Sequence, residues 1–295
     1  MKRAFLLAAL SLALAAPGRA ADWKSVTPAE FASKTKVVVG SNALSYYRLE
    51  PGKPLRLTVG GPTQLKLLTR LAMSETATRG AYVLTVLVDG VAVKTDTLST
   101  VPSKDARYPA LEGVRPGAIR RVYVDVPTGT HGCEIRVEGR AVVDARVFRA
   151  LGDGAPLVSV APRRFGSVEV LKAGAKELTY YLLTKASSLV LDVTGPTTIT
   201  VNTRLLFDHT MVKDQVYTVG VRADGGAERV YRIETRPSTS MTCRDRKDQV
   251  PGALRTLKLE VGKGRHTYEF RLADSVAEGV AVKFLIPRGD AAHAR

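Results

Sequence analysis

Two arginines, Arg70 and Arg204, occupy the same place in a Thr-Arg-Leu tripeptide that occurs twice in the chain. Apolar residues alternate with other types just before each arginine, as in a strand whose successive side chains point to opposite faces. We therefore expect Arg70 to point outward together with Lys66 and Leu68, and the second arginine to do likewise. An outward guanidinium offers a planar fork of donors to a carboxylate or a phosphate. The alternative is that each arginine pairs with an acid on a neighbouring strand, or packs where two domains meet.

Two pairs of adjacent tyrosines, Tyr46-Tyr47 and Tyr180-Tyr181, also occupy matching positions. Because neighbouring residues of a strand face opposite ways, one tyrosine of each pair should be partly exposed. Tyr46 and Tyr180 are therefore candidates for stacking on a sugar ring, since an aromatic face offers apolar area and the hydroxyl a polar handle. The alternative is a structural tyrosine that ties a loop down. Trp23, the only tryptophan, lies near the expected mature N-terminus, which counts against a flat polysaccharide platform on either repeat.

Two polar loops are expected at residues 99–108 and 238–248, each followed by a Pro-Gly dipeptide at a matching position. Loops on a rigid scaffold often carry the binding residues. In the second loop Arg244, Arg246 and Lys247 lie close together and would suit an anionic group. The loops could equally be solvated and without function.

The positions of the histidines and the absence of known catalytic motifs in the sequence argue against an enzyme. His131 and His266 each end a Gly-x-His turn before a core strand, and we expect each to form a hydrogen bond with the turn backbone. A Gly-x-His turn followed by alternating apolar residues resembles the final hairpin of many carbohydrate-binding and other extracellular sandwich modules. His209 follows Asp208 but has no counterpart in the other repeat. Because no nucleophile elbow, metalloprotease motif or phosphate loop is present, we predict no catalytic residue, no metal site and no cofactor.

An internal duplication organises these residues. The stretch at residues 55–71 returns at 189–205, and Gly61-Pro62-Thr63 matches Gly195-Pro196-Thr197 at an offset of 134 residues. Each stretch predicts two short strands around a Gly-Pro turn. Many short strands of period two, separated by turns, are typical of antiparallel sandwiches. The predicted fold is all-β, with two tandem antiparallel β-sandwich domains of the Ig-like or jelly-roll kind.

The predicted segments follow from the repeat and from changes in composition. Residues 27–30 read Thr-Pro-Ala-Glu, the pattern of a capped helix start. In chain order we expect a signal peptide at 1–20, an N-terminal segment with a short helix at 21–40, repeat 1 at 41–150, a linker at 151–164, repeat 2 at 165–288 and a tail at 289–295.

The N-terminus predicts export. Lys2 and Arg3 precede a short apolar run and a small-residue exit, which is the layout of a secretory signal peptide. The run is short of the roughly 20 residues that span a bilayer, although an uncleaved anchor is the alternative. We expect a periplasmic or secreted protein with no transmembrane segment after signal removal.

The formal charge of +16 falls to +13 when the three basic residues of the leader are removed. A basic protein outside the cytosol favours an anionic envelope polymer as partner, and no nucleic acid is expected. The alternative is that lysines and arginines simply coat the solvent faces of strands. Cys133 and Cys243 are the only cysteines. They either form a disulfide between the domains or stay free, with Cys133 in a buried strand position.

These observations favour an exported, non-catalytic binding protein of the cell envelope that engages a glycan or another anionic envelope component. The alternative is a structural or assembly protein with a protein partner, met at sheet edges or at the domain junction. A hydrolase with a hidden site around His209 and Asp208 is a third hypothesis.

Overall fold

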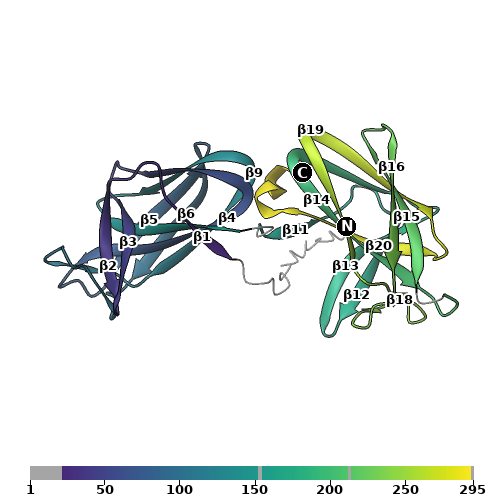
Figure 1. Ribbon diagram of the computed structural model, residues 1–295, viewed down its shortest axis with the longest axis horizontal. Helices are drawn as coiled ribbons and strands as arrows, with labels where there is room; N and C mark the ends of the chain where they lie inside the picture. Colours follow the sequence, from purple (N-terminus) through teal and green to yellow (C-terminus); the bar gives the residue numbers. More distant parts are fainter. Residues whose placement is uncertain (1–21, 152–154, 212–213, 294–295) are drawn as a thin grey trace, which may run out of the picture.

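The computed structural model describes residues 22–151, 155–211 and 214–293, which form two antiparallel sheets and one short 3-10 helix (Figure 1). The predicted all-β fold with two sandwich-like halves is therefore confirmed. The predicted signal peptide at residues 1–20 lies outside the described residues. Within those residues, no helix is long and apolar enough to cross a membrane.

The first half contains ten strands. They are β1 (Trp23–Val26), β2 (Ser33–Val39), β3 (Asn42–Leu49), β4 (Leu55–Ser74), β5 (Gly80–Val88), β6 (Val91–Thr100), β7 (Ala106–Arg107), β8 (Val114–Pro116), β9 (Arg120–Val137) and β10 (Val143–Ala150).

The second half contains ten more strands and the helix. They are β11 (Leu157–Val160), β12 (Ser167–Ala173), β13 (Lys176–Thr184), β14 (Leu189–Phe207), β15 (Gln215–Ala223), β16 (Glu228–Thr235), β17 (Thr242–Cys243), β18 (Val250–Pro251), β19 (Arg255–Asp274), β20 (Gly279–Pro287) and η1 (Arg288–His293).

Both sheets have the same topology. The first sheet runs β6-β5-β9-β4-β10-β3-β2-β7, with β1 added to β10 and β8 to β4. The second sheet runs β16-β15-β19-β14-β20-β13-β12-β17, with β11 added to β20 and β18 to β14. Every strand of the first half thus has a counterpart ten numbers later, so the duplication extends over all ten strands.

The Gly-Pro motif bends one continuous strand in each half, so the prediction of two short strands around a turn is wrong. In β4 the register to β9 shifts between Gly61 and Thr63, and pairing then continues. A Cβ on Gly61 would lie 1.7 Å from the carbonyl oxygen of Pro127, so only glycine allows β9 to approach this closely. One end of β9 pairs with β5 while the far end of β4 pairs with β10. The two long strands therefore contribute to both layers of the sandwich.

Alternating apolar residues fill the space between the layers. Leu65 and Leu67 of β4 are fully buried, and the intervening Lys66 is half-buried on the opposite face. Burying one such leucine is worth about 1.5–3 kcal/mol. Each half has its own core of this kind, so the strand pattern read from the sequence corresponds to the inward and outward faces of the sheets.

The expected short helix after residue 27 does not form. The backbone amides of Ala29 and Glu30 both donate to the carbonyl oxygen of Arg56, and the Arg56 amide donates back to Glu30. Pairing with β4 therefore satisfies the groups that a helix start would leave open. Since β1 and β2 belong to the first sheet and β11 to the second, residues 21–40 are not a separate segment, and the predicted linker at 151–164 contains a strand.

The end of the chain connects the two halves. Residues of the predicted tail lie in η1, drawn in yellow between the halves in Figure 1. Asp290 is 2% exposed and accepts hydrogen bonds from the amide and hydroxyl of Thr128 in the first half, both at 2.8 Å. It also accepts a bond of 2.6 Å from the hydroxyl of Thr197 in the second half. The Asp290 carboxylate therefore joins β9 to β14.

Candidate functional site

The two matching arginines lie between the sheet and the loop that covers it. Arg70 is 6% exposed. Its Nη1 donates to the carbonyl oxygen of Gly117 at 2.8 Å, and its Nε lies 3.4 Å from the Tyr46 hydroxyl. Arg204 is half-buried and makes the same two contacts, with Gly252 at 2.8 Å and Tyr180 at 3.4 Å. Arg70 is therefore not exposed as predicted and Arg204 only partly so, and each arginine holds a loop against the sheet.

The two tyrosines are buried for the same reason. Tyr46 is 1% exposed and packs with Val37 and Tyr108, because the segment at residues 101–117 covers this part of the outer face. Tyr180 is 3% exposed and packs with Met241 under the corresponding loop of the second half. Neither ring is open to a sugar, and the role of tying a loop down accounts for both.

Segment 101–117 of the first half covers a buried carboxylate, Asp144, which has no equivalent at the corresponding place of the second half. Asp144, fully buried, accepts from Arg48 at 2.9 and 3.1 Å and from the Tyr108 hydroxyl. Burial first, and then the charge of Asp144, raises the pKa of Tyr108 far above its usual range, so the phenol stays protonated and donates. In the second half Ala281 stands opposite Arg204, where the first half has Asp144.

The predicted anion site of the second loop is occupied by acids of the chain itself. Arg246 pairs with the buried Glu169 at 3.1 Å and with Glu278 at 3.1 Å. Burial raises the pKa of Glu169, although Arg246 opposes that shift. Arg244 pairs with its neighbour Asp245 at 2.9 Å. Lys247 is exposed and forms no ion pair among the described residues. Arg244, Arg246 and Lys247 thus lie in one loop without forming an open cationic pocket.

The turn histidines clamp one hairpin to the next strand. His131 Nδ1 lies 2.6 Å from Asp89 Oδ2, and Asp89 Oδ1 accepts the Gly132 amide at 2.8 Å. His266 pairs in the same way with Asp224 at 2.7 Å. The expected contact with the turn backbone is present at His131, whose Nε2 lies 3.3 Å from the Thr128 carbonyl oxygen. These histidines therefore have a structural role that both halves share.

The remaining chemical candidates also have local partners. Asp208 accepts from the amide and hydroxyl of Thr210, at 2.8 and 2.6 Å, so its carboxylate shapes the turn that carries His209. Cys133 and Cys243 are free and buried, so the disulfide alternative does not apply to this structure. Burial raises the pKa of Cys133 to about 11 and that of Cys243 to about 12, which keeps both thiols protonated.

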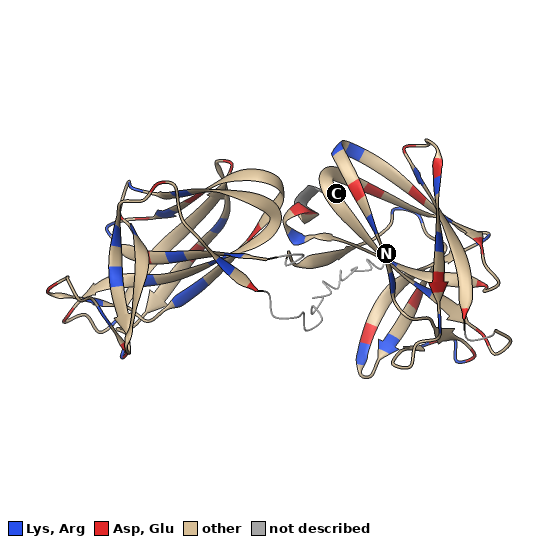
Figure 2. Cartoon of the chain, in the orientation of Figure 1, with Lys and Arg blue, Asp and Glu red and all other residues tan. Residues whose placement is uncertain are grey.

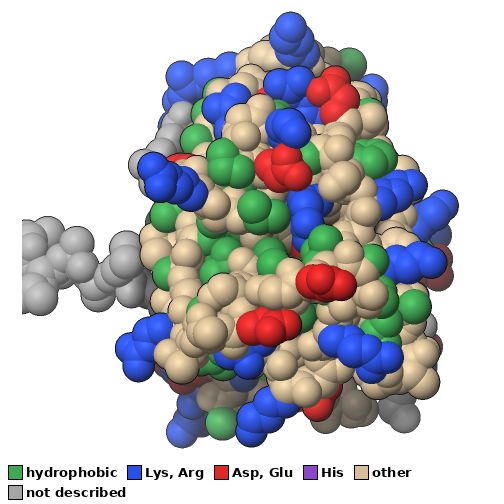
Figure 3. Space-filling view, turned by 90° about the vertical axis from the view of Figure 1, so that its left-hand side faces the viewer, with side chains coloured by type: hydrophobic (Ala, Val, Ile, Leu, Met, Phe, Trp, Pro, Cys, Tyr) green, Lys and Arg blue, Asp and Glu red, His purple; other side chains and the backbone are tan. Residues whose placement is uncertain are grey.

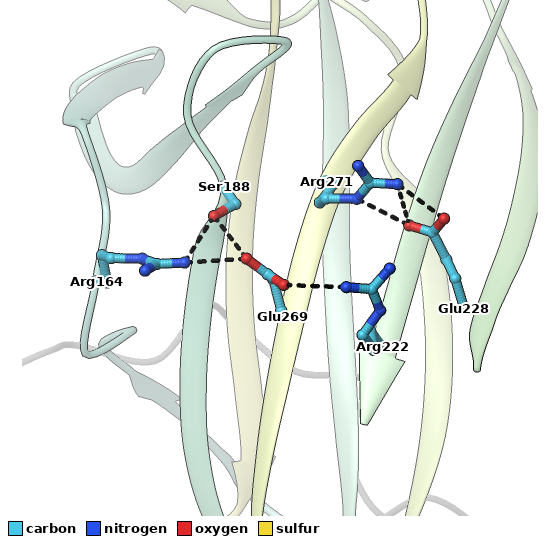
Figure 4. Close-up of polar contacts among 6 residues, drawn as sticks. All are labelled: Arg164, Ser188, Arg222, Glu228, Glu269 and Arg271. Atoms are coloured by element: carbon cyan, nitrogen blue, oxygen red, sulfur yellow. Dashed lines mark hydrogen bonds and ion pairs between the residues drawn. The ribbon is translucent and has the colours of Figure 1, made fainter. Parts of the chain in front are cut away.

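Many of the surface arginines form ion pairs. Basic and acidic residues are spread along the strands and loops of both halves (Figure 2). In Figure 4 Arg164 pairs with Glu269 at 2.9 Å, and Arg271 pairs with Glu228 at 2.8 Å. From the end where β2 and β3 lie, basic, acidic and hydrophobic side chains are interspersed (Figure 3). The positive net charge is therefore distributed, in line with arginines that coat the solvent faces of strands.

A group of aromatic and basic side chains that the sequence did not single out lies on the outer face of the first half. Four residues form one row across β1, β10, β4 and β9, where Phe148 stands between Ser25 and Lys66, and Lys66 faces Tyr123. Residues two positions away share a face of a strand, which adds Trp23, Arg146 and Arg121. We call this group the aromatic–basic face. Its members are Trp23, Lys66, Arg121, Tyr123, Arg146 and Phe148.

The rings and cations of the aromatic–basic face are in direct contact. The Trp23 and Tyr123 ring centroids are 5.9 Å apart at an interplanar angle of 54°. Lys66 Nζ lies 4.1 Å from the Trp23 centroid and 5.1 Å from that of Phe148. The Arg146 guanidinium carbon lies 4.9 Å from the Phe148 centroid. Tyr123 is 45% exposed, so one side of this cluster is open to solvent.

The cations of the aromatic–basic face lack acidic partners. Among the described residues, Lys66, Arg121 and Arg146 form no ion pair, in contrast to the arginines of Figure 4. Burial, and to a lesser degree the nearby Arg121, lowers the pKa of Lys66. The neighbouring acid, Asp125, accepts from Gln64 at 2.8 Å and lies 3.9 Å from Arg288 of η1. The aromatic–basic face is therefore positively charged and partly shielded from water, which suits a ligand that carries an anionic group on an apolar surface.

The second half shows that the fold does not require these aromatic residues. Its corresponding row contains Ser159, Leu285, Thr200 and Lys258. Leu157 stands where the first half has Trp23, so the same sheet forms there with no ring at any of the three aromatic positions. One sequence signal could have revealed the face, because Ser25-Val26 and Pro28 recur as Ser159-Val160 and Pro162 at the offset of 134 residues. That match places Trp23 inside the repeat.

Comparison with known proteins gives no family. No family model matches the chain, and no curated protein matches it. Among solved structures, the tandem CBM51 modules of a family 98 glycoside hydrolase from Streptococcus pneumoniae are 12% identical, with 90% of this chain and 92% of that chain covered and a TM-score of 0.26. The tandem CBM22 modules of Paenibacillus barcinonensis Xyn10C are 9% identical, with 92% and 99% covered and a TM-score of 0.28.

An enzyme also appears among the similar structures. The glycosylasparaginase PNGase F from Flavobacterium meningosepticum is 11% identical, with 90% of this chain and 95% of that chain covered and a TM-score of 0.25. At these TM-scores the likeness carries no argument about what this chain does. The function is therefore argued from the residues of the chain itself.

Proposed function

We propose that this chain is an exported, non-catalytic protein that binds a glycan or another anionic component of the cell envelope. The aromatic–basic face carries the proposal. It combines three aromatic rings with three cations that have no acidic partner among the described residues, on a sheet surface that the second half builds without rings.

A saccharide matches the two properties of this face. Sugar rings have apolar faces that pack on aromatic rings, while their hydroxyls bond to polar groups at the ring edges. Tyr123 supplies both in one residue, since 45% of it is exposed and it ends in a hydroxyl. The ring of Trp23 extends the apolar area beside it. Export is inferred from residues 1–20, whose basic start and short apolar run have the layout of a signal peptide. The cell envelope would then offer anionic polymers as ligands.

The test measures glycan binding of the mature protein by calorimetry, with peptidoglycan fragments, lipopolysaccharide and soluble neutral and acidic polysaccharides. Trp23→Ala should weaken binding about tenfold or more, because burying an aromatic ring is worth ~1.5–3 kcal/mol and ~1.4 kcal/mol is a factor of ten. Leu157→Ala, at the corresponding place in the second half, is the matched control and should leave binding unchanged. Equal losses in both variants, or no binding to any glycan, would refute the proposal.

One observation favours the alternative of a protein partner. The edge strand β6 is ten residues long, and Val91 and Val93 are 66% and 46% exposed at its start. A long edge strand can pair with a strand of another protein. If Val93→Lys abolished a defined complex that Trp23→Ala leaves intact, assembly would replace glycan binding as the function.

A further inference from the structure

We infer that the ligand of the aromatic–basic face is a polysaccharide with repeated uronic acid residues, and that Lys66, Arg121 and Arg146 select it by its carboxylates. This inference rests on the proposed function and adds the substrate class. It depends on where the cations stand relative to the rings and to one another.

The first step is the short distance between cation and ring. The Arg146 guanidinium lies 4.9 Å from the Phe148 centroid, and the Lys66 ammonium lies 4.1 Å from that of Trp23. A ligand that satisfies both groups needs its negative charge directly beside an apolar face. A uronic acid has this arrangement, because its carboxylate is attached to the sugar ring. A neutral sugar provides the apolar face and hydroxyls but no negative charge, and a phosphate chain provides the charge without the apolar face.

The second step is the spacing of the cations. Arg146 and Arg121 flank Leu68 on β10 and β9, on either side of β4. Two interstrand spacings separate their backbones, about 10 Å in all. A polymer that carries a carboxylate on successive residues can engage both, and each guanidinium fork can bind its carboxylate through two parallel bonds.

The third step is the state of Lys66. Its ammonium is half-buried between two rings, and its pKa is lowered by burial and by Arg121. An anion placed over the face would oppose both effects, so binding a carboxylate should raise the pKa of Lys66. In the second half Lys283 holds the position of Arg146, but Thr256 and Thr200 replace Arg121 and Lys66. The second half therefore offers Lys283 and Lys258 on this face but no aromatic ring, and we expect it not to bind.

The experiment compares a uronic acid polymer, polygalacturonate, with its carboxyl-reduced neutral form and with inorganic polyphosphate, each at low and at physiological salt. Polygalacturonate should bind most tightly and weaken as salt rises. Arg146→Gln should weaken its binding about tenfold, and the more exposed Arg121→Gln about threefold. Lys283→Gln removes the same charge from the corresponding place in the second half, and should change binding less than about twofold. Circular dichroism of each variant checks that it is folded.

The outcomes separate this inference from the proposed function. If the carboxyl-reduced polymer binds as tightly as polygalacturonate and salt has no effect, glycan binding stands and the choice of uronate is wrong. If polyphosphate binds as well as polygalacturonate and Trp23→Ala does not matter, the face responds to charge alone, and the inference is also overturned. If neither acidic nor neutral glycans bind, the proposed function fails together with the inference.

Discussion

Replacing Arg70 tests whether this arginine serves the fold or a ligand. In the folded chain its guanidinium donates to the Gly117 carbonyl oxygen at 2.8 Å and lies next to the Tyr46 hydroxyl. The Arg70→Ala variant removes both contacts and leaves the Gly117 oxygen without its charged donor. Segment 101–117, which covers Tyr46, then loses one of the bonds that hold it to the sheet.

The expected cost follows from these contacts. A hydrogen bond that involves a charged group is worth about 1.5–3 kcal/mol. The contact of 3.4 Å with Tyr46 adds little, and the lost packing of a side chain that is 6% exposed brings the total to about 2–4 kcal/mol. With a urea dependence of roughly 2 kcal/mol per molar, the midpoint of unfolding of the first half should fall by about 1–2 M.

Urea denaturation, together with hydrogen exchange at residues 101–117, measures the effect. Arg70→Lys is the control, because it keeps the charge but not the fork, and it should recover only part of the stability. At low temperature without urea, Arg70→Ala should still bind the glycan, since Arg70 lies outside the aromatic–basic face. Unchanged stability combined with lost binding would refute the structural role and restore the sequence-based expectation of a ligand contact.

Three further predictions concern other buried or clamped groups. Asp144→Ala leaves the half-buried charge of Arg48 without its acid and should destabilise the first half by about 3 kcal/mol, measured by urea unfolding; a change below about 1 kcal/mol would contradict the role of this ion pair. Asp290→Ala should leave each half folded but loosen the junction, seen as faster amide exchange at Thr128 and a broader small-angle scattering envelope; identical exchange would exclude the junction role. The clamp between Asp224 and His266 should be pH-dependent in both directions. Its hydrogen bond to His266 lowers the pKa of Asp224 below 3.8, so that contribution is complete above 3.8 and is lost as pH falls through the folded value. The pKa of His266 is raised above 6.5, so its contribution is complete below 6.5 and is lost as pH rises through the folded value. Unfolding midpoints should therefore vary less with pH in Asp224→Asn than in the natural chain, and an unchanged profile would disprove the clamp.

The sequence predicted the strands well because their periodicity is local. Alternating apolar residues such as Leu65 and Leu67 do face the core, and Lys66, Leu68 and Arg70 do share the opposite face. The exposure of Arg70 was predicted wrongly because segment 101–117, distant in sequence, folds over that face. Local alternation determines which side a residue faces, but it does not determine what covers that side.

Two other errors have similar physical causes. Gly61-Pro62 resembles a turn, yet the absent Cβ at Gly61 lets β9 pass so closely that the strand bends and continues. The sequence pattern places Trp23 outside the repeat, because its strand is short and gains its place only by pairing with Ala150 at the far end of the first half. The sequence pattern does not reveal the aromatic–basic face for the same reason, since its rings and cations come from four strands that are separated in the chain.

The most direct test of the central claim uses Trp23 itself, because it is the only tryptophan in the chain and lies in the proposed binding face. Its fluorescence is recorded while the mature protein is titrated with polygalacturonate, and the same titration is followed by calorimetry. Glycan binding at this face predicts a saturable change in Trp23 emission with the dissociation constant that calorimetry gives. Heat of binding with no change in Trp23 emission would place the ligand elsewhere on the molecule and contradict the proposed site.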